Sequence, residues 1–551
     1  MLAILLCVRG APSQTMETAR QGAVATDQLL ASATGISILR KGGNAVDAAI
    51  AIAYTLAVTY PAAGNIGGGG FMLVRFANGK SHFIDFRETA PAAGRADMYL
   101  DAQGNVVPGR STLGALSAGV PGTVAGLEYA RAHYATLSRK DLMADAIEYA
   151  TAGFTLSESD AAMIAGARER LGKFASTSAI FSPDGATPKA GTLFRQPDLA
   201  RTLRHIDADG ADGFYRGDVA HEIASSIQAA GGIITEADLA AYRVVDRAPV
   251  SCRYRGNTVV TAPLPSSGGV AMCEIFGMLA ADVPRAPVRS FQNAHLLLEA
   301  ERRAFRDRNT QLGDPAFVKS RASALLDPAY LKGQRGTIDP ERATPSNALA
   351  LSDAHEGSNT TSFSVVDAAG NAVNVSYTLN DSFGSALVAG MSGVLLNDEM
   401  DDFTSKPGVP NIYGLVQGTA NAIAPGKRPL SSMSPTVVVA PSGKALLVVG
   451  AAGGPRIIST VLDSIRAVVD FGEDATTALQ DPRVHMQWLP DVVYADAAAF
   501  DDATAARLRS AGYTLKLAPV SSVANAILVT TDGRRLPAHD PRKPGGAALW
   551  Y

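Results

Sequence analysis

The pattern of apolar residues changes at about residue 360, and this change constrains the fold more than any other feature of the chain. Before it, helical periodicity predominates over residues 18–58, 120–245 and 289–335. After it, strand-like runs predominate, at 361–367, 372–379, 435–440 and 445–450, and a helix is expected at 454–471. There is no obvious repeat and no long linker. Helices followed by strands in this way predict sheets covered by helices in one large layered α/β unit.

The stretch SNTTSFSVVDAAGNAVNVSYTLN at 358–380 predicts a β-hairpin that begins with two adjacent threonines. Threonine at the start of a strand is ordinarily a strand-forming residue and no more. Its hydroxyl is also a possible nucleophile, provided that a base takes its proton. A cut just before Thr360 would supply that base, because the new α-amine has a pKa of about 8 and lies beside the hydroxyl.

Such a cut can be intramolecular. The Oγ of Thr360 attacks the carbonyl of Asn359, the acyl group shifts from nitrogen to oxygen, and water releases the ester. The nucleophile should then begin a strand where the character of the chain changes, behind a polar segment. Residues 336–359 form such a segment. The layout agrees with a self-cleaving threonine, but it agrees equally with an ordinary strand.

Composition excludes several classes of protein. The chain has 551 residues, 47% of them hydrophobic, with 49 basic against 52 acidic residues and no basic block, so nucleic acid is not supported as a partner. The apolar run at 45–58 is too short to span a bilayer and contains Asp47. The length alone would suggest two to four domains, although large α/β folds are exceptions to that expectation.

Motifs for metals and nucleotides are missing from the sequence. Three widely spaced cysteines do not suggest a disulfide framework, and the eight histidines are scattered singly, so no metal is expected. The glycines at 67–70 do not form a nucleotide fingerprint, and no serine lies in a G-x-S-x-G elbow. DADGADG at 207–213 has its glycine at the wrong offset for a calcium loop. No cofactor is expected.

The first residues leave two interpretations open. Leu2–Val8 resembles the end of a signal-peptide apolar region, so residues 1–17 are a possible remnant of such a signal. However, no Lys or Arg precedes the run and it is shorter than usual, as in an ordinary terminus. A periplasmic or secreted location is the expectation.

Several long motifs together resemble γ-glutamyltranspeptidases. They run in the family's order from about residue 20 to the C-terminus and include GGNAVDAA, GNIGGGGFML, IDFRETAP, PGTVAG, ITEADLAAY, APLPSSGG, NTTSFSVVDAAGNAVNVSYTLNDSFGS, SGVLLNDEMDDFTSKPGVPNIYGLV, KRPLSSMSPT and GAAGGPRIISTVL. The resemblance implies the N-terminal-nucleophile hydrolase fold, a four-layer αββα sandwich. It also implies a precursor that cleaves itself between Asn359 and Thr360. The large subunit (18–359) and the small catalytic subunit (360–551) would form a heterodimer within one αββα unit.

The resemblance also implies roles for residues at matching positions. Thr360 would be the nucleophile and Thr378 the threonine that orients it, with Gly453 and Gly454 as the oxyanion hole. Backbone N–H groups of glycines suit that role because no Cβ intrudes. The substrate's α-carboxylate would be bound by Arg87, Ser431 and Ser432, and its α-ammonium by Asn380, Glu399 and Asp402. Tyr413 would belong to a lid over the pocket.

The implied reaction is a ping-pong transfer through a γ-glutamyl–threonine ester. The donor is glutathione or a related γ-glutamyl compound, and the acceptor is water, an amino acid or a peptide. A cephalosporin or glutaryl acylase on the same scaffold is the alternative, although Arg87, Asp402 and the paired serines favour a substrate with a free amino-acid head. A non-catalytic γ-glutamyl-binding relative is a further alternative. Many relatives have histidine at the position of Ser362, a departure that concerns local packing.

Overall fold

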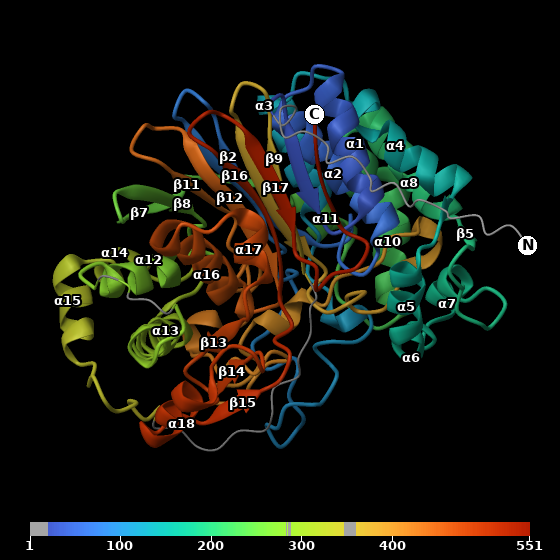
Figure 1. Cartoon of the computed structure of the whole chain (residues 1–551). Coiled ribbons are helices and arrows are strands. Elements are labelled where there is room, and N and C mark those ends of the chain that lie inside the picture. Colours follow the sequence, from blue (N-terminus) through green and yellow to red (C-terminus); the bar gives the residue numbers. More distant parts are fainter. Residues whose placement is uncertain (1–19, 283, 285–287, 347–359) are drawn as a thin grey trace, which may run out of the picture.

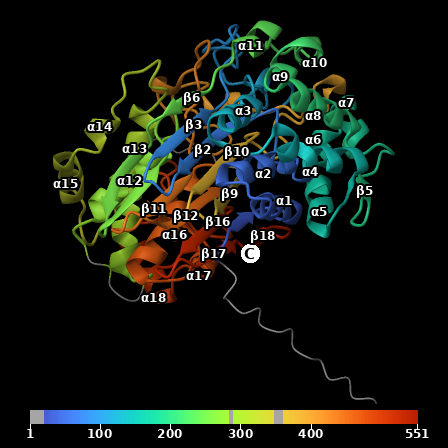
Figure 2. The same ribbon diagram turned by 90° about the horizontal axis from the view of Figure 1, so that it is seen from above.

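The computed structural model describes residues 20–282, 284, 288–346 and 360–551 (Figure 1). Two sheets pack face to face, and helices cover the outer face of each, so that the layers follow the order helix, sheet, sheet, helix (Figure 1, Figure 2). One large apolar cluster lies between the first sheet and its helices, and another lies between the sheets and under the helices of the second. The predicted αββα sandwich is confirmed.

Within the described residues, the first sheet has seven antiparallel strands, in the order β18-β1-β9-β10-β2-β3-β6. In that order they are β18 (Ala547–Trp550), β1 (Ala23–Thr26), β9 (Thr360–Val366), β10 (Ala372–Thr378), β2 (Gly69–Arg75), β3 (Ser81–Phe86) and β6 (Val245–Arg247). Its outer layer is built from α1 (Leu29–Arg40), α2 (Ala45–Thr59), α3 (Thr123–Tyr134), α4 (Arg139–Ala152) and α8 (Pro197–Asp209). The sheet therefore joins strands from before and after residue 360.

The second sheet, over the same described ranges, has six antiparallel strands in the order β17-β16-β12-β11-β8-β7. They are β17 (Arg535–His539), β16 (Val523–Val529), β12 (Ala445–Ala452), β11 (Thr436–Val439), β8 (Asn257–Thr261) and β7 (Val250–Tyr254). Its outer layer contains α12 (Gly268–Leu279), α13 (Phe291–Gln311), α16 (Arg456–Phe471) and α17 (Ala475–Gln480).

Shorter elements complete the flanks. Beside the first helical layer lie α5 (Glu158–Gly166), α6 (Arg168–Leu171), α7 (Ala175–Phe181), α9 (Asp212–Tyr215), α10 (Gly217–Ala229) and α11 (Glu236–Ala241), with strands β4 (Phe154–Thr155) and β5 (Leu193–Phe194). Beside the second lie α14 (Ala322–Leu325), α15 (Pro328–Gly336) and α18 (Asp502–Ser510), with strands β13 (Val484–Met486), β14 (Val493–Ala495) and β15 (Leu515–Leu517).

Helix α2 shows how the sequence pattern produces the core. It begins after Asn44, whose side chain accepts hydrogen bonds from the N–H groups of Val46 and Asp47, while Asp47 accepts one from the N–H of Asn44. This reciprocal capping box satisfies N–H groups that would otherwise lack partners. Every residue of α2 is buried, as expected for a helix that is apolar nearly all round.

The predicted hairpin is strands β9 and β10. Their register sets Thr360 opposite Thr378 at the open end of the hairpin, and the turn closes through a hydrogen bond from the N–H of Gly370 to the carbonyl of Asp367. Gly370 has φ of +89°, a conformation that glycine adopts without strain. The hairpin lies at the centre of the first sheet, between β1 and β2.

The structure contains a disulfide that the sequence analysis did not predict. Cys252 on β7 and Cys273 on α12 are bonded, with their Cα atoms 5.8 Å apart. The spacing of the three cysteines did not predict this pair, because the two residues meet only when α12 packs against β7.

The described ranges contain no helix long and apolar enough to cross a membrane.

Candidate active site

A small pocket at the end of the β9–β10 hairpin collects the residues that the sequence analysis selected. Its lining residues are Arg87, Thr360, Thr378, Asn380, Glu399, Asp402, Tyr413, Leu415, Ser431, Ser432, Met433, Gly454, Pro455 and Ile457. Every expected site residue that the structure describes is present in this lining except Gly453, which is next to Gly454. Asn359 and residues 1–17 lie outside the described residues.

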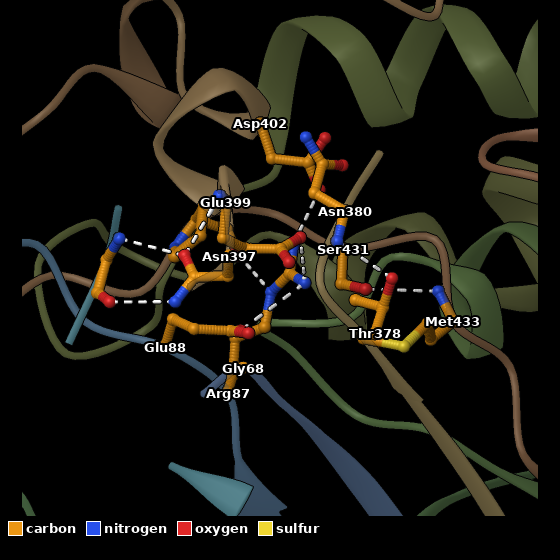
Figure 3. Close-up of polar contacts among 12 residues, drawn as sticks. Gly68, Arg87, Glu88, Thr378, Asn380, Asn397, Glu399, Asp402, Ser431 and Met433 are labelled. Atoms are coloured by element: carbon orange, nitrogen blue, oxygen red, sulfur yellow. Dashed lines mark hydrogen bonds and ion pairs between the residues drawn. The ribbon is translucent and has the colours of Figure 1, made fainter. Parts of the chain in front are cut away.

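Thr360 is the first residue of β9 and is 5% exposed. Its Oγ1 donates to Oγ1 of Thr378 over 3.4 Å. The same Thr378 oxygen accepts the backbone N–H of Asn380 at 2.9 Å (Figure 3). Oγ1 of Thr378 therefore accepts two hydrogen bonds, one of them from the Thr360 hydroxyl. Asn380 has φ of +79°, and its side-chain amide donates to the carbonyl of Asp398 at 3.1 Å.

Arg87 follows β3 and is fully buried among carboxylates (Figure 3). One guanidinium nitrogen contacts Glu399, and the other lies 2.5 Å from Oδ2 of Asp402. Glu88 is 3.7 Å away. Burial alone would lower the pKa of Arg87, but these carboxylates raise it above its ordinary value. The fixed cation of the pocket is therefore held by the same acidic groups that were expected to bind an ammonium.

The acidic groups around Arg87 do not all ionise readily. Burial raises the pKa of Glu88 to about 7, against the opposing effect of Arg87. Burial also raises the pKa of Glu399 well above its ordinary value. Both carboxyl oxygens of Glu88 and Oε2 of Glu399 are buried and receive no hydrogen bond from the described residues. A low dielectric and closely spaced like charges account for the raised pKa values of Glu88 and Glu399.

Ser431 and Ser432 are held by groups from α12 and α13. The carbonyl of Ser431 accepts the hydroxyl of Ser267 at 2.6 Å, and Oγ of Ser431 accepts the N–H of Met433 at 3.1 Å. Oγ of Ser432 accepts a hydrogen bond from Arg308 at 3.0 Å. Both serines line the same pocket as Arg87, and these hydrogen bonds hold them there.

Arg308 is a second buried guanidinium at the site, and the sequence analysis did not select it. It donates to Ser267 and Ser432, and burial lowers its pKa to about 10. The sequence did not mark Arg308, because residues 289–335 form a charged helical region, in which an arginine side chain is ordinarily exposed to solvent.

Gly453 and Gly454 connect β12 to α16 with φ of +134° and +57°. A Cβ on Gly454 would lie 2.9 Å from the ring of Tyr413, and one on Gly453 would lie 2.7 Å from the carbonyl of Ser521. Glycine is required at both positions. Helix α16 begins at Arg456, so its N-terminal N–H groups add positive potential beside the pocket.

Tyr413 lines the pocket and is 4% exposed. Its hydroxyl donates to the carbonyl of Asn380 at 2.8 Å, and its own carbonyl accepts the amide of Gln487 at 3.3 Å. Gln487 in turn lies 3.0 Å from Nε2 of His485, whose Nδ1 is 2.7 Å from the hydroxyl of Ser459. These supporting residues were not predicted either, because no motif marks them.

The arrangement can bind a small zwitterion beside a hydroxyl nucleophile. Arg87, Asp402 and Glu399 supply both signs of charge, and a ligand carrying adjacent carboxylate and ammonium groups can exchange for these internal ion pairs. Backbone N–H groups near Gly454 can stabilise a developing oxyanion.

Comparison with known proteins adds independent findings. The family model described as Gamma-glutamyltranspeptidase matches residues 31–550. The chain is 48% identical to the glutathione hydrolase proenzyme of Pseudomonas sp. (strain A14), over 98% of this chain and 96% of that protein. The structure matches cephalosporin acylase from Bacillus halodurans with a TM-score of 0.85 at 24% identity, covering 100% and 99% of the two chains, which is a likeness of fold. It matches Helicobacter pylori gamma-glutamyltranspeptidase with a TM-score of 0.58 at 41% identity, covering 64% and 100%.

Proposed function

The chain belongs to the γ-glutamyltranspeptidase family and is an autoprocessed enzyme, and from that premise we propose that it cleaves the γ-glutamyl amide of glutathione and related compounds. The γ-glutamyl group then passes to water or to an amino acid or peptide acceptor. The name of the Pseudomonas relative, glutathione hydrolase proenzyme, supports glutathione as the donor.

The proposed autocleavage lies between Asn359 and Thr360. It yields a large subunit of residues 18–359 and a small subunit of residues 360–551, which remain together as a heterodimer. The position of Thr360 as the first residue of β9, and its hydrogen bond to Thr378, support this assignment. The Helicobacter pylori chain, matched over its whole length, corresponds to 64% of this one, close to the share that precedes Thr360.

In the proposed mechanism, the new α-amine of Thr360 takes the proton of its own hydroxyl. Oγ then attacks the γ-carbonyl carbon of the donor, and the C–N bond breaks as the leaving amine receives that proton. A γ-glutamyl ester on Thr360 remains. Water or an acceptor amine then attacks this ester and gives a proton to the α-amine. The C–Oγ bond breaks, and the α-ammonium returns that proton to Oγ, which releases the product and regenerates Thr360. No metal or organic cofactor takes part.

Recognition of the γ-glutamyl head follows from the charges of the pocket. The guanidinium of Arg87, with the hydroxyls of Ser431 and Ser432, would bind the α-carboxylate. Asp402, Glu399 and Asn380 would bind the α-ammonium. The substrate would replace internal ion pairs of Arg87 with its own groups, so each buried charge keeps a partner.

Stabilisation of the tetrahedral intermediate is assigned to Gly453 and Gly454. Their positive φ values and the lack of room for a Cβ support an approach of the backbone to the reacting oxygen. The first turn of α16 adds the favourable potential of a helix N-terminus. Tyr413 would exclude water from the closed pocket.

One observation carries the proposal: Thr360 shares a small pocket with a buried arginine, two serines and two carboxylates. The test is the intact mass of the purified protein under denaturing conditions, for the wild type and for Thr360→Ala. Two wild-type chains, the smaller beginning at Thr360, are expected, with an uncut variant. Turnover of γ-glutamyl anilide by the wild type is the second measurement. A single, inactive wild-type chain would overturn the proposal.

The acylase alternative has no separate support. The likeness to cephalosporin acylase, at 24% identity, concerns the fold alone. A glutaryl anilide lacks the α-ammonium, so equal turnover of glutaryl and γ-glutamyl anilides would favour the alternative.

We assign the protein to the periplasm or to secretion. The disulfide between Cys252 and Cys273 supports an oxidising compartment. Fractionation of cells followed by activity measurement tests this location, and activity confined to the cytoplasm would refute it.

A further inference from the structure

Thr361, the residue after the proposed nucleophile, donates a hydrogen bond to a buried carboxylate. Its Oγ1 lies 2.8 Å from Oδ2 of Asp27, which follows β1, the neighbour of β9 in the sheet. Successive side chains of a strand point to opposite faces, so this contact lies on the face of β9 away from the Thr360 side chain. Asp27 therefore restrains the backbone beside Thr360 without touching the substrate.

Asn525 on β16 supports the other oxygen of Asp27. Its side-chain amide nitrogen donates to Oδ1 of Asp27 and to the carbonyl of Ser362, both at 2.7 Å. Both partners are acceptors, so the reverse orientation of the amide would set oxygen against oxygen. The amide oxygen of Asn525 must therefore face the opposite way, where it meets His539.

His539 ends β17 with an acceptor at each ring nitrogen. Nδ1 lies 2.9 Å from Oδ1 of Asn525, and Nε2 lies 2.7 Å from the carbonyl of Lys543. Nδ1 also lies 4.0 Å from Oδ1 of Asp27. The ring of His539 thus links Asn525 to the loop at Lys543.

Few other titratable groups lie near His539 among the described residues. Strands β1, β16 and β18 and helix α17, which pack on β17, carry none among their described residues. The nearby charged groups come from loops and from α5. Lys543 lies over the ring of Tyr60 at 4.5 Å, Asp160 is near Lys543, and Asp540 pairs with Arg483. Asp27, Asn525 and His539 therefore make the central contacts of this network.

We propose that Asp27, Asn525 and His539 form a positioning network that holds Thr361, and through it Thr360, in the orientation needed for attack. The inference rests on the proposed role of Thr360 as nucleophile. His539 contacts the amide oxygen of Asn525 and so fixes the amide nitrogen toward Asp27, which restrains Thr361 on β9.

Variants of Thr361 test the positioning role. Thr361→Val removes the hydroxyl but keeps the shape, and we expect kcat on γ-glutamyl anilide to fall about 10- to 100-fold with KM unchanged. Thr361→Ser keeps the hydroxyl and should restore most of kcat. The matched control is Thr34→Val, because Thr34 makes the same kind of buried hydrogen bond, 2.7 Å to Asp145, between α1 and α4. Equal kcat values for Thr361→Val and Thr34→Val would leave Thr361 with a structural role alone.

If Thr361→Val fails to cleave itself, the rate of self-cleavage replaces kcat as the comparison with Thr34→Val. An uncut, inactive wild type would refute the proposed function. An active wild type with equal losses in Thr361→Val and Thr34→Val would refute the positioning role alone.

Discussion

Arg87 and Asp402 form an ion pair that is open to solvent on its carboxylate side. The two groups are 2.5 Å apart, with side chains 0% and 13% exposed, whereas Glu399 on the other guanidinium nitrogen is 1% exposed. An incoming ligand can therefore reach Asp402 first. Asp402 and Glu399, which the family resemblance assigns to the same ammonium, therefore differ in their access to solvent.

Asp402→Asn should weaken binding of the γ-glutamyl head. A hydrogen bond to a charged group contributes about 1.5–3 kcal/mol, so kcat/KM should fall about 10- to 100-fold, mainly through KM. Steady-state kinetics with γ-glutamyl anilide measure the loss. Glutaryl anilide is the matched control, because it lacks the ammonium and should respond little to the substitution. An equal loss on both substrates would contradict the assignment.

Tyr413→Phe should loosen the cover of the pocket. The substitution removes the hydrogen bond to the carbonyl of Asn380, worth about 1 kcal/mol, so we expect kcat/KM to fall about fivefold. Tyr99→Phe is the control, since Tyr99 is equally buried and its hydroxyl donates to the carbonyl of Leu116 at 2.9 Å. The prediction fails if both variants retain the wild-type rate.

The raised pKa of Glu88 makes stability depend on pH. Burial raises this pKa from 4.5 to about 7, so the folded protein binds more protons than the unfolded chain between these values. Stability therefore falls as pH rises through that window. Between pH 5 and pH 8, the free energy of unfolding should fall by about 2 kcal/mol more in the parent than in Glu88→Gln. Urea denaturation in an uncut Thr360→Ala background measures it, and parallel pH profiles for the two proteins would refute it.

Loss of the disulfide should destabilise the second sheet. Cys252 and Cys273 are 21 residues apart, and closing a loop of that size contributes about 3 kcal/mol. Cys252→Ala should lower the free energy of unfolding by about that amount, and a reductant should do the same to the wild type. If the reductant also lowers the free energy of unfolding of Cys252→Ala, its effect on the wild type has a source other than this disulfide.

Residues that act within continuous motifs could be predicted from the sequence. Thr360, Arg87, Asp402 and Ser431 meet in one pocket as expected, although they are far apart in the chain. The hairpin was predicted because its alternation and turn chemistry are local. Helix α16 begins two residues later than expected, at Arg456, because Gly453 and Gly454 adopt positive φ.

Residues that act through packing could not be predicted. Arg308 and Gln487 reach the site from elements whose burial is set by their tertiary neighbours. The internal pairing of Arg87 with Glu399 was also missed, since the resemblance assigns each group a role toward the ligand and not toward the other. Likewise, the link between Thr361 and Asp27 joins positions more than 300 residues apart.

The central position of the hairpin affects what a cut before Thr360 would do. Strands β9 and β10 lie between β1 and β2, and β11 pairs with β8, so each sheet contains strands from both sides of the cut. Neither product would fold by itself, and dilution would not separate the two chains. A dissociation constant would then have no experimental meaning, and the two chains would unfold in a single transition. Purified fragments mixed after denaturation would have to fold around each other.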